Sequence, residues 1–341
     1  MSSSDRCLIG MLRATGSPGL VATAMAMAAR CQGADLVFFR PADIAPDRRR
    51  IRAKAFDGTS WTEVDSRYPD IVENDDACLS GRYWDGWAPL RETAAYTTRR
   101  LGGKAAVARL IAGCRDFDPL IIPQSIPQDD ADIARGLETF GEIVLKPVFG
   151  SQGRNVWKLR RRPGGLHLQG PGVSEDLPQV DGLHQRITGG RRYLLQKYVE
   201  SRTDAGNPFD IRLHSRRDGT GAWTTVKIYA RIGLSGSITS NVATGGSIGE
   251  ALPLLAQRYG QGAPAVMQTL ERLARDIPVW TQSVYKAFRI DALGIDLGLD
   301  AAGRPWLFEI NSFPGAKYFE VADAIPRIGY CLHLAGRPSG A

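Results

Sequence analysis

The most constraining feature of the sequence is a segment near its C-terminus that predicts a β-hairpin. Residues 295–299 and 306–310 have strand character, and the intervening Asp300-Ala-Ala-Gly303 is typical of a turn. In such a hairpin Glu309 and Asn311 are two residues apart, so their side chains point to the same face of the sheet.

The same hairpin predicts a metal site. We expect Asp296, on the partner strand, to reach the face that carries Glu309 and Asn311. Two carboxylates and one amide oxygen are ligands that Mg²⁺ uses when water and phosphate supply the rest. The alternative, a hairpin with its carboxylates in solvent, stays open, although the flanking Phe308 and Ile310 are a poor setting for a solvated surface.

Length and composition limit the class of protein. A chain of 341 residues can bury a large core and should form two or three domains. Its 43% hydrophobic and 23% charged residues are typical of a soluble globular protein, and its apolar runs are too short for a membrane span or a signal peptide. Five scattered cysteines without a Cys-x-x-Cys pair argue against a disulfide framework or a zinc site. We therefore expect a cytoplasmic protein with no membrane partner.

The net charge of +7 favours anionic small molecules or acidic peptides as partners. No recognisable nucleic-acid motif with interleaved aromatic residues is present, so we do not expect a nucleic acid as the partner.

The N-terminal region predicts a small open α/β domain. A helix is expected at residues 20–30, strands at 35–40 and 70–72, and a hairpin at 51–64, whereas residues 73–95 are loop-rich.

A glycine-rich turn between two strands indicates a phosphate site. After helices expected at residues 103–113 and near 129–139, a strand that begins at Ile143 carries Lys146 and leads into residues 150–153. Small residues there let backbone N–H groups approach an anion, and the Lys146 ammonium could meet phosphates. The alternative is a glycine-rich hairpin with a surface lysine.

The C-terminal half predicts further strands at residues 193–200, 209–215 and 223–232, and a helix over 262–289. The strand at 193–200 could present backbone groups to an adenine edge. Residues 163–190 are rich in proline and glycine.

In this order, the motifs resemble the ATP-grasp superfamily of ATP-dependent carboxylate–amine ligases, over roughly residues 95–320. The glycine-rich loop after Lys146 and the Asn241-Val-Ala-Thr-Gly-Gly loop look most like the YheC/YheD branch. The resemblance implies an α/β ATP-grasp fold with α+β subdomains. An N-terminal substrate domain at 1–95 would precede a central subdomain at 96–192 and a C-terminal subdomain at 193–335.

The resemblance also implies ligands for individual residues. The residues that would bind ATP, through its phosphates, adenine and ribose, are Lys104, Lys146, Gly150, Ser151, Gln152, Gly153, Gln196, Lys197, Tyr198, Val199 and Glu200. Arg212, Arg231 and Asn241 would act on the transferred phosphate. Asp296, Glu309 and Asn311 would bind two Mg²⁺ ions. Those that would lie by the acceptor are Ser312, Gly315 and Lys317.

The function that the resemblance implies is formation of an amide or peptide bond through an acyl phosphate, with release of ADP and phosphate. The substrates would be small molecules or peptides that carry carboxylate and amine groups. A kinase on the same fold and a non-catalytic ATP-binding protein of a spore or cell-surface assembly are the alternatives.

The surplus of cations further predicts a substrate with a second carboxylate. Arg212, Arg231 and Lys317 are expected near the metal hairpin, and only one arginine is needed for the acyl phosphate. In the alternative, Arg231 simply pairs with a local acid.

Overall fold

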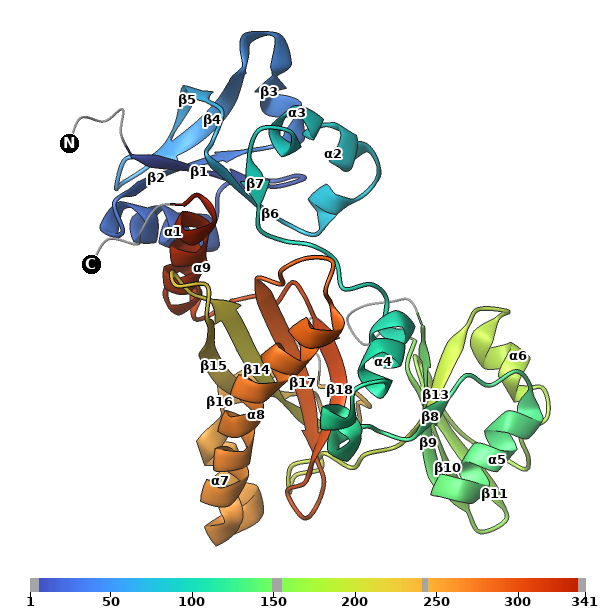
Figure 1. Cartoon of the computed structure of the whole chain (residues 1–341). Helices are drawn as coiled ribbons and strands as arrows, with labels where there is room; N and C mark the ends of the chain where they lie inside the picture. The colour runs from blue at the N-terminus through green and yellow to red at the C-terminus, as the bar shows by residue number, and fades with distance from the viewer. Residues whose placement is uncertain (1–5, 149–154, 241–244, 337–341) are drawn as a thin grey trace.

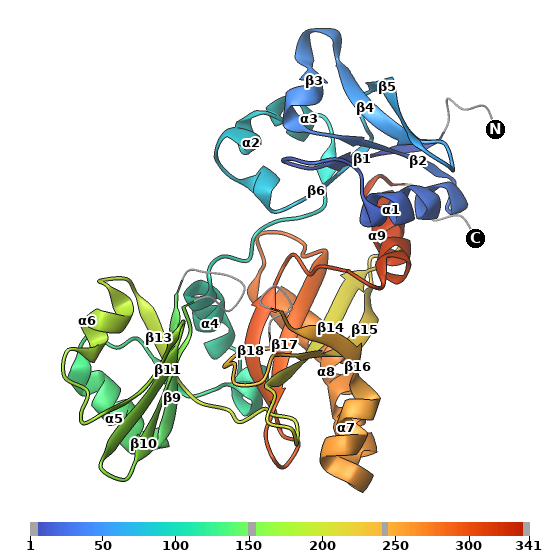
Figure 2. The ribbon, with the colours of Figure 1, turned by 180° about the vertical axis from the view of Figure 1, so that it is seen from behind.

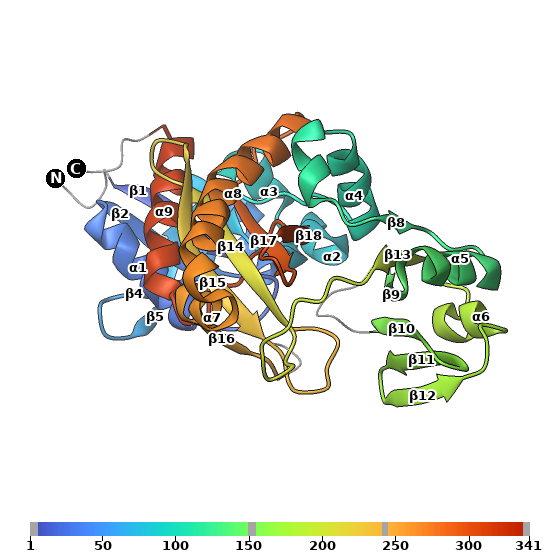
Figure 3. The same cartoon turned by 90° about the horizontal axis from the view of Figure 1, so that it is seen from below.

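The described part of the chain forms three β-sheets in sequence order, each with its own helices. The computed structural model describes residues 6–148, 155–240 and 245–336. The three resulting units are seen from opposite sides in Figures 1 and 2, and Figure 3 shows the second and third units side by side. Among the described residues, no helix is both long and apolar enough to cross a membrane.

The first unit is an open α/β sheet, which confirms the predicted fold class of this region. Its strands are β1 (Cys7–Leu12), β2 (Ala34–Phe39), β3 (Ile44–Ala45), β4 (Arg50–Phe56), β5 (Trp61–Arg67), β6 (Ile71–Asn74) and β7 (Ala95–Tyr96). Its helices are α1 (Leu20–Cys31), α2 (Gly81–Asp85) and α3 (Ala88–Arg91). β1 pairs in parallel with β2 and β6, and β4 and β5 form the predicted hairpin. The expectation of loops over 73–95 missed α2 and α3.

The second unit is an antiparallel sheet in the order β12-β11-β10-β9-β13-β8. Its strands are β8 (Gln124–Ser125), β9 (Glu142–Pro147), β10 (Trp157–Arg162), β11 (Gly165–Gly170), β12 (Val173–Leu177) and β13 (Tyr193–Lys197). Its helices are α5 (Asp130–Phe140) and α6 (Leu183–Thr188). The Asp129 carboxylate accepts a hydrogen bond from the Asp132 N–H at 2.9 Å and so caps α5, whose Ile133 and Leu137 pack on the sheet. The expected C-terminal subdomain begins at residue 193, but β13, which starts at Tyr193, pairs with β9 in this sheet.

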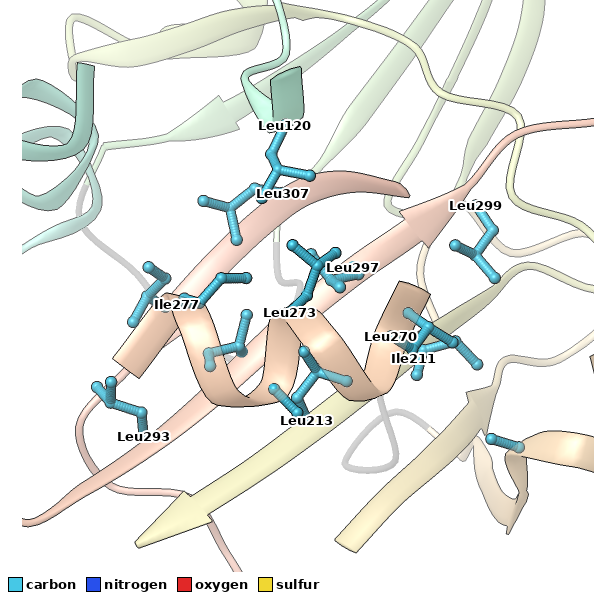
Figure 4. Packing of buried hydrophobic residues seen from close by; sticks show 14 of the residues in the cluster. Leu120, Ile211, Leu213, Leu270, Leu273, Ile277, Leu293, Leu297, Leu299 and Leu307 are labelled. Carbon is cyan, nitrogen blue, oxygen red and sulfur yellow. The ribbon is translucent and has the colours of Figure 1, made fainter. Parts of the chain in front are cut away.

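The third unit is an antiparallel sheet in the order β16-β15-β14-β17-β18. Its strands are β14 (Phe209–Arg217), β15 (Trp223–Ile232), β16 (Ser247–Glu250), β17 (Ala292–Leu299) and β18 (Pro305–Asn311). The helices around it are α4 (Lys104–Ala112), α7 (Ala251–Tyr259) and α8 (Ala263–Val284). Leu273 and Ile277 of α8 lie over the apolar face formed by Leu213 and Leu297 (Figure 4). This packing fixes the predicted hairpin, β17–β18, against a rigid core.

The last helix, α9 (Glu320–Leu334), returns to the first unit and packs beside α1 (Figure 1). Ala324, Ile328 and Cys331 of α9 are fully buried in one apolar cluster with Met25 of α1 and Ile9 of β1. The expected C-terminal subdomain runs to residue 335 and so includes this helix. In the structure the helix shares its apolar core with the N-terminal domain.

Buried charges connect α9 to both the first and the third sheet. Asp323 of α9 is fully buried and contacts His214 of β14, whose Nε2 lies 2.8 Å from the Asp323 carboxylate. Asp323 also accepts a hydrogen bond from Arg216. Glu73 of β6 accepts hydrogen bonds from Arg13 at 2.7 Å and from Arg327 of α9. The first unit is thus tied to the third through one helix.

His214 should make the stability of the fold depend on pH. Burial lowers the pKa of His214 from 6.5 to about 4, and Arg216 adds to this, whereas Asp323 opposes it. Between these two values the unfolded chain binds a proton that the folded chain does not, so stability is lost as the pH falls. We expect a loss of roughly 2 kcal/mol in the free energy of unfolding between pH 7 and pH 5.

The measurement is urea unfolding of the wild type and of His214→Gln at both pH values. Burial raises the pKa of Asp210 and of Asp291, so these two acids make the folded protein more stable as the pH falls. Their contribution opposes the loss of stability caused by His214. The difference between the two proteins isolates the histidine. An equal pH dependence in both would contradict the assignment.

Candidate functional site

A cavity of about 160 Å³ lies between the second and third sheets. One wall comes from β9 and the end of β13, and the opposite wall comes from β14, β15 and the β17–β18 hairpin. The predicted site residues that line it are Lys146, Gln196, Lys197, Tyr198, Val199, Arg231, Asp296 and Glu309. Segments separated by more than 150 positions in the sequence therefore meet at one place.

The register of the hairpin puts the three predicted metal ligands on one face. Asp296 of β17 lies directly opposite Glu309 of β18, and Gly294 lies opposite Asn311. Residues two apart on a strand share a face, so Asn311 lies on the same face as Glu309. Asp296 is 4% exposed, whereas Glu309 and Asn311 are half-buried. Asp296 and Glu309 line the cavity.

Asp296 and Asp210 form a buried ion network with two arginines. Arg212 donates to both carboxylate oxygens of Asp296, one of them at 2.9 Å, and Arg231 Nη2 lies 2.8 Å from the same carboxylate. Arg231 also donates two hydrogen bonds, of 2.7 and 2.8 Å, to Asp210. The open alternative for Arg231, pairing with a local acid, is therefore what the structure contains.

This network sets the ionisation of both acids. Burial favours the neutral form of Asp296, but Arg212 and Arg231 outweigh it, and the pKa of Asp296 is lowered. For Asp210, burial dominates and raises the pKa despite Arg231. Both carboxylates and both guanidiniums together carry no net charge, so this cluster holds less surplus positive charge than the sequence suggested.

The donor set fits a hard cation without a preformed cage. Among the described residues, no group of three His, Cys, Asp or Glu side chains is placed to hold a metal ion. The predicted set instead combines two carboxylates with the Asn311 amide. An ion there would share Asp296 with the two arginines and leave coordination positions for water and phosphate, as Mg²⁺ requires.

The wall formed by the second sheet presents two lysines, Lys146 and Lys197, and a fixed strand end. Lys146 of β9 donates to the Phe308 carbonyl at 3.4 Å, across the cleft from its own sheet. The Tyr198 N–H donates to the Glu142 carbonyl at 3.0 Å, and the Gln196 side chain donates to Gln124 at 2.5 Å. These bonds hold residues 196–199 as a rigid wall of the cavity.

Several predicted residues lie elsewhere. Glu200 is exposed, as are Gly315 and Lys317, whereas Ser312 is buried in a different cavity. Of Lys104, only the backbone position in α4 is described. The predicted residues Gly150, Ser151, Gln152, Gly153 and Asn241 fall outside the described residues.

Sequence reasoning missed Asp210, Ser240 and Lys158. The Asp210 carboxylate accepts hydrogen bonds from Arg231 and from the Ser240 hydroxyl. Lys158 Nζ lies 3.4 Å from the centre of the Tyr198 ring. Asp210 stands in the Phe209-Asp-Ile-Arg212 segment, where an acid two residues from an arginine on a strand was the available signal.

Comparison with known proteins gives a family. The model of the YheC/D-like ATP-grasp family matches residues 94–327. Endospore coat-associated protein YheC of Bacillus subtilis (strain 168) is 26% identical over 309 residues, which cover 84% of this chain and 82% of that protein. Endospore coat-associated protein YheD of the same organism is 26% identical over 190 residues, or 53% of this chain and 41% of that protein.

Solved structures agree on the fold. The chain is similar to the ATP-grasp ligase PsnB complexed with a phosphomimetic variant of its minimal precursor, Mg and ADP, with a TM-score of 0.54 and 12% identity over 97% of this chain and 99% of that one. N5-carboxyaminoimidazole synthase from Aspergillus clavatus, in complex with ADP and 5-aminoimidazole ribonucleotide, gives a TM-score of 0.56 and 10% identity over 98% of this chain and 78% of that one. At these identities the likeness shows the fold alone, and that fold is ATP-grasp.

Proposed function

This chain belongs to the YheC/D-like ATP-grasp family, and we propose that it is a ligase that uses ATP and Mg²⁺ to join a carboxylate to an amine. The observation that carries the proposal is the cavity between the second and third sheets. It sets a lysine, Lys146, against two carboxylates, Asp296 and Glu309. A polyphosphate with its cation needs this combination of charges.

In the proposed reaction, a carboxylate oxygen of the first substrate attacks the γ-phosphorus of ATP. ADP leaves, and an acyl phosphate remains. The amine nitrogen of the second substrate then attacks the acyl carbon and loses a proton, and inorganic phosphate leaves. The product is an amide or peptide bond.

The residues of the site supply position and charge. Lys146 would neutralise the phosphates from one wall, and Arg231 would donate hydrogen bonds to the transferred phosphoryl group from the other. Asp296, Glu309 and Asn311 would hold Mg²⁺, which supplies charge neutralisation at the phosphates when bound. Residues 196–199 would form the adenine wall, and Asp210 would keep Arg231 in place.

A second candidate function is that of a non-catalytic ATP-binding protein in a coat or surface assembly. The names of the curated relatives, which are endospore coat-associated, favour it. They also leave open a location in a spore coat in place of the cytoplasm. A kinase on the same fold is the third candidate.

Release of ADP separates the three candidates. A ligase releases ADP only when a carboxylate is present, and an added amine consumes the acyl phosphate. A kinase releases ADP with a hydroxyl substrate and needs no amine. A protein that binds ATP but releases no ADP with amino acids, peptides or hydroxyl compounds would fit the structural role and contradict the ligase.

Lys146→Ala should weaken ATP binding roughly ten- to a hundredfold. A lysine beside a phosphate in a partly dry site is a point-charge contact of a few kcal/mol, which converts to that range of affinity. Calorimetry with ATP and Mg²⁺ measures it, and Lys286→Ala, at an exposed position in the third unit, is the control. If Lys146→Ala and the control bind ATP equally, Lys146 is not a phosphate ligand.

A further inference from the structure

A second cavity, of about 350 Å³, lies between the first unit and the end of the β17–β18 hairpin. Arg13, Asn74 and Thr98 line it from the first unit, and Ser312 and Arg327 line it from the opposite side. An adjoining hollow of about 330 Å³ shares Arg13 and Arg327 and reaches the start of α1. The two arginines therefore line both spaces.

This space lies near the proposed ATP site along the chain. Ser312 follows Asn311 directly and lies three residues beyond Glu309. A strand rises about 3.3 Å per residue, so Ser312 is roughly 10 Å from the predicted metal ligand. A substrate that extends about this far from the phosphates of ATP would reach the wall of this space at Ser312.

Arg13 and Arg327 retain hydrogen-bond donors although both contact Glu73. Arg13 makes three described hydrogen bonds, to Leu12, to the Glu73 carbonyl and to the Glu73 carboxylate. Arg327 also makes three, two to Glu73 and one to Asp323. A guanidinium carries five N–H groups, so each has donors left for a ligand. One buried carboxylate, Glu73, thus faces two guanidiniums.

The acids that line the cavity are engaged by other groups. Asp76 pairs with Arg100, Asp75 accepts the Cys78 N–H at 3.0 Å, and Asp291 accepts the Thr98 hydroxyl at 3.1 Å. Arg216 also lines the cavity, so three arginines offset the charges of these three acids. The unused N–H donors of Arg13 and Arg327, and not a net positive charge, are therefore what an anionic ligand would use.

We propose that Arg13 and Arg327 bind a carboxylate of the substrate that does not react. This inference rests on the proposed function and names the substrate class: an amino acid, a peptide end or a dicarboxylate, with a free carboxylate beyond the reacting group. It keeps the second carboxylate that the sequence predicted and assigns it to another pair of arginines, because Arg212 does not line the cavity of the proposed ATP site and Arg231 is proposed to contact the transferred phosphoryl group. Guanidinium groups match a carboxylate through paired hydrogen bonds.

The test uses succinate and its neutral diamide, succinamide, as probes in calorimetry. Wild type should bind succinate and not succinamide. Arg13→Gln removes the charge while Arg327 still pairs with Glu73, and it should weaken succinate binding roughly tenfold or more. Its thermal melting temperature, measured in parallel, reports whether the variant is folded.

A pair of surface variants gives a second, independent measurement. Ala77 is exposed and lines the cavity, so a new side chain there should leave the fold intact. Ala77→Glu should weaken succinate binding about fivefold and Ala77→Lys should strengthen it, through the charge at the entrance. Ala77→Gln is the uncharged control.

The inference is overturned if wild type does not distinguish succinate from succinamide, or if the Arg13 and Ala77 variants bind succinate as wild type does. ATP binding with Mg²⁺, titrated on the same proteins, tests the proposed function separately. Loss of the succinate signal with intact ATP binding defeats only the inference, whereas absent ATP binding by wild type defeats the proposed function.

Discussion

Glu309→Ala should reduce ADP production at least about a hundredfold while the protein stays folded. Glu309 is half-buried at the cavity and lies opposite Asp296. The Asp296 carboxylate already forms ion pairs with Arg212 and Arg231. Glu309 is thus the carboxylate through which a cation would bind with the least competition from those arginines. Its removal takes away a ligand that would hold the cation against the phosphates, which affects turnover by orders of magnitude.

The measurement is ADP release with saturating ATP and Mg²⁺, alongside a melting curve. Glu309→Gln keeps the size of the side chain and removes only the charge, so it should lose activity to a similar extent. Glu63→Ala, at an exposed position on β5, should behave as wild type. Production of ADP by Glu309→Ala at the wild-type rate would remove Glu309 from the metal site.

The hairpin could be predicted because its signals are local. The alternating residues of both strands and the turn at residues 300–303 lie close together in the sequence. They predict that the side chains of Glu309 and Asn311 share one face of the sheet. The partners of Asp296 are not local, since Arg212 lies 84 positions away. The alternation of side chains along a strand predicts which face of the sheet each one occupies. It does not predict which counter-ion a neighbouring strand supplies. For this reason the pairing of Arg231 with an acid stays an open alternative at the level of sequence, and the pairing of Arg212 with Asp296 is not predicted.

The composition of residues 163–190, rich in proline and glycine, predicted no strands, whereas the structure places β11 and β12 there. Gly164 and Gly172 occupy the two turns of this β-meander, with φ of +80° and +71°. Glycine adopts this left-handed conformation without strain, so a glycine at such spacing marks a turn as readily as a loop. The subdomain expected to end at residue 335 did not anticipate that α9 packs on the first unit, because a sequence pattern says nothing of which apolar surface a helix covers.

Glu73→Ala should destabilise the fold by roughly 3–5 kcal/mol. Glu73 is 1% exposed and accepts hydrogen bonds from Arg13 of the first unit and from Arg327 of α9. The two arginines outweigh the effect of burial and lower the pKa of Glu73, so the carboxylate is charged in the folded protein. Its removal leaves two guanidiniums in a largely buried place without their shared partner, which is the costly way to break a buried ion pair.

Urea unfolding at pH 7 measures this loss, and Asp65→Ala is the matched control. Asp65 also faces two arginines, Arg48 and Arg50, but at a surface where more than half of its side chain is exposed. There, solvent screens the charges, so the control should cost less than about 1 kcal/mol. Equal effects of the two substitutions would mean that the contact between α9 and the first unit depends on its apolar cluster and not on Glu73. A large effect of Glu73→Ala alone would make this carboxylate the link that couples the proposed substrate arginines to the folding of the first unit.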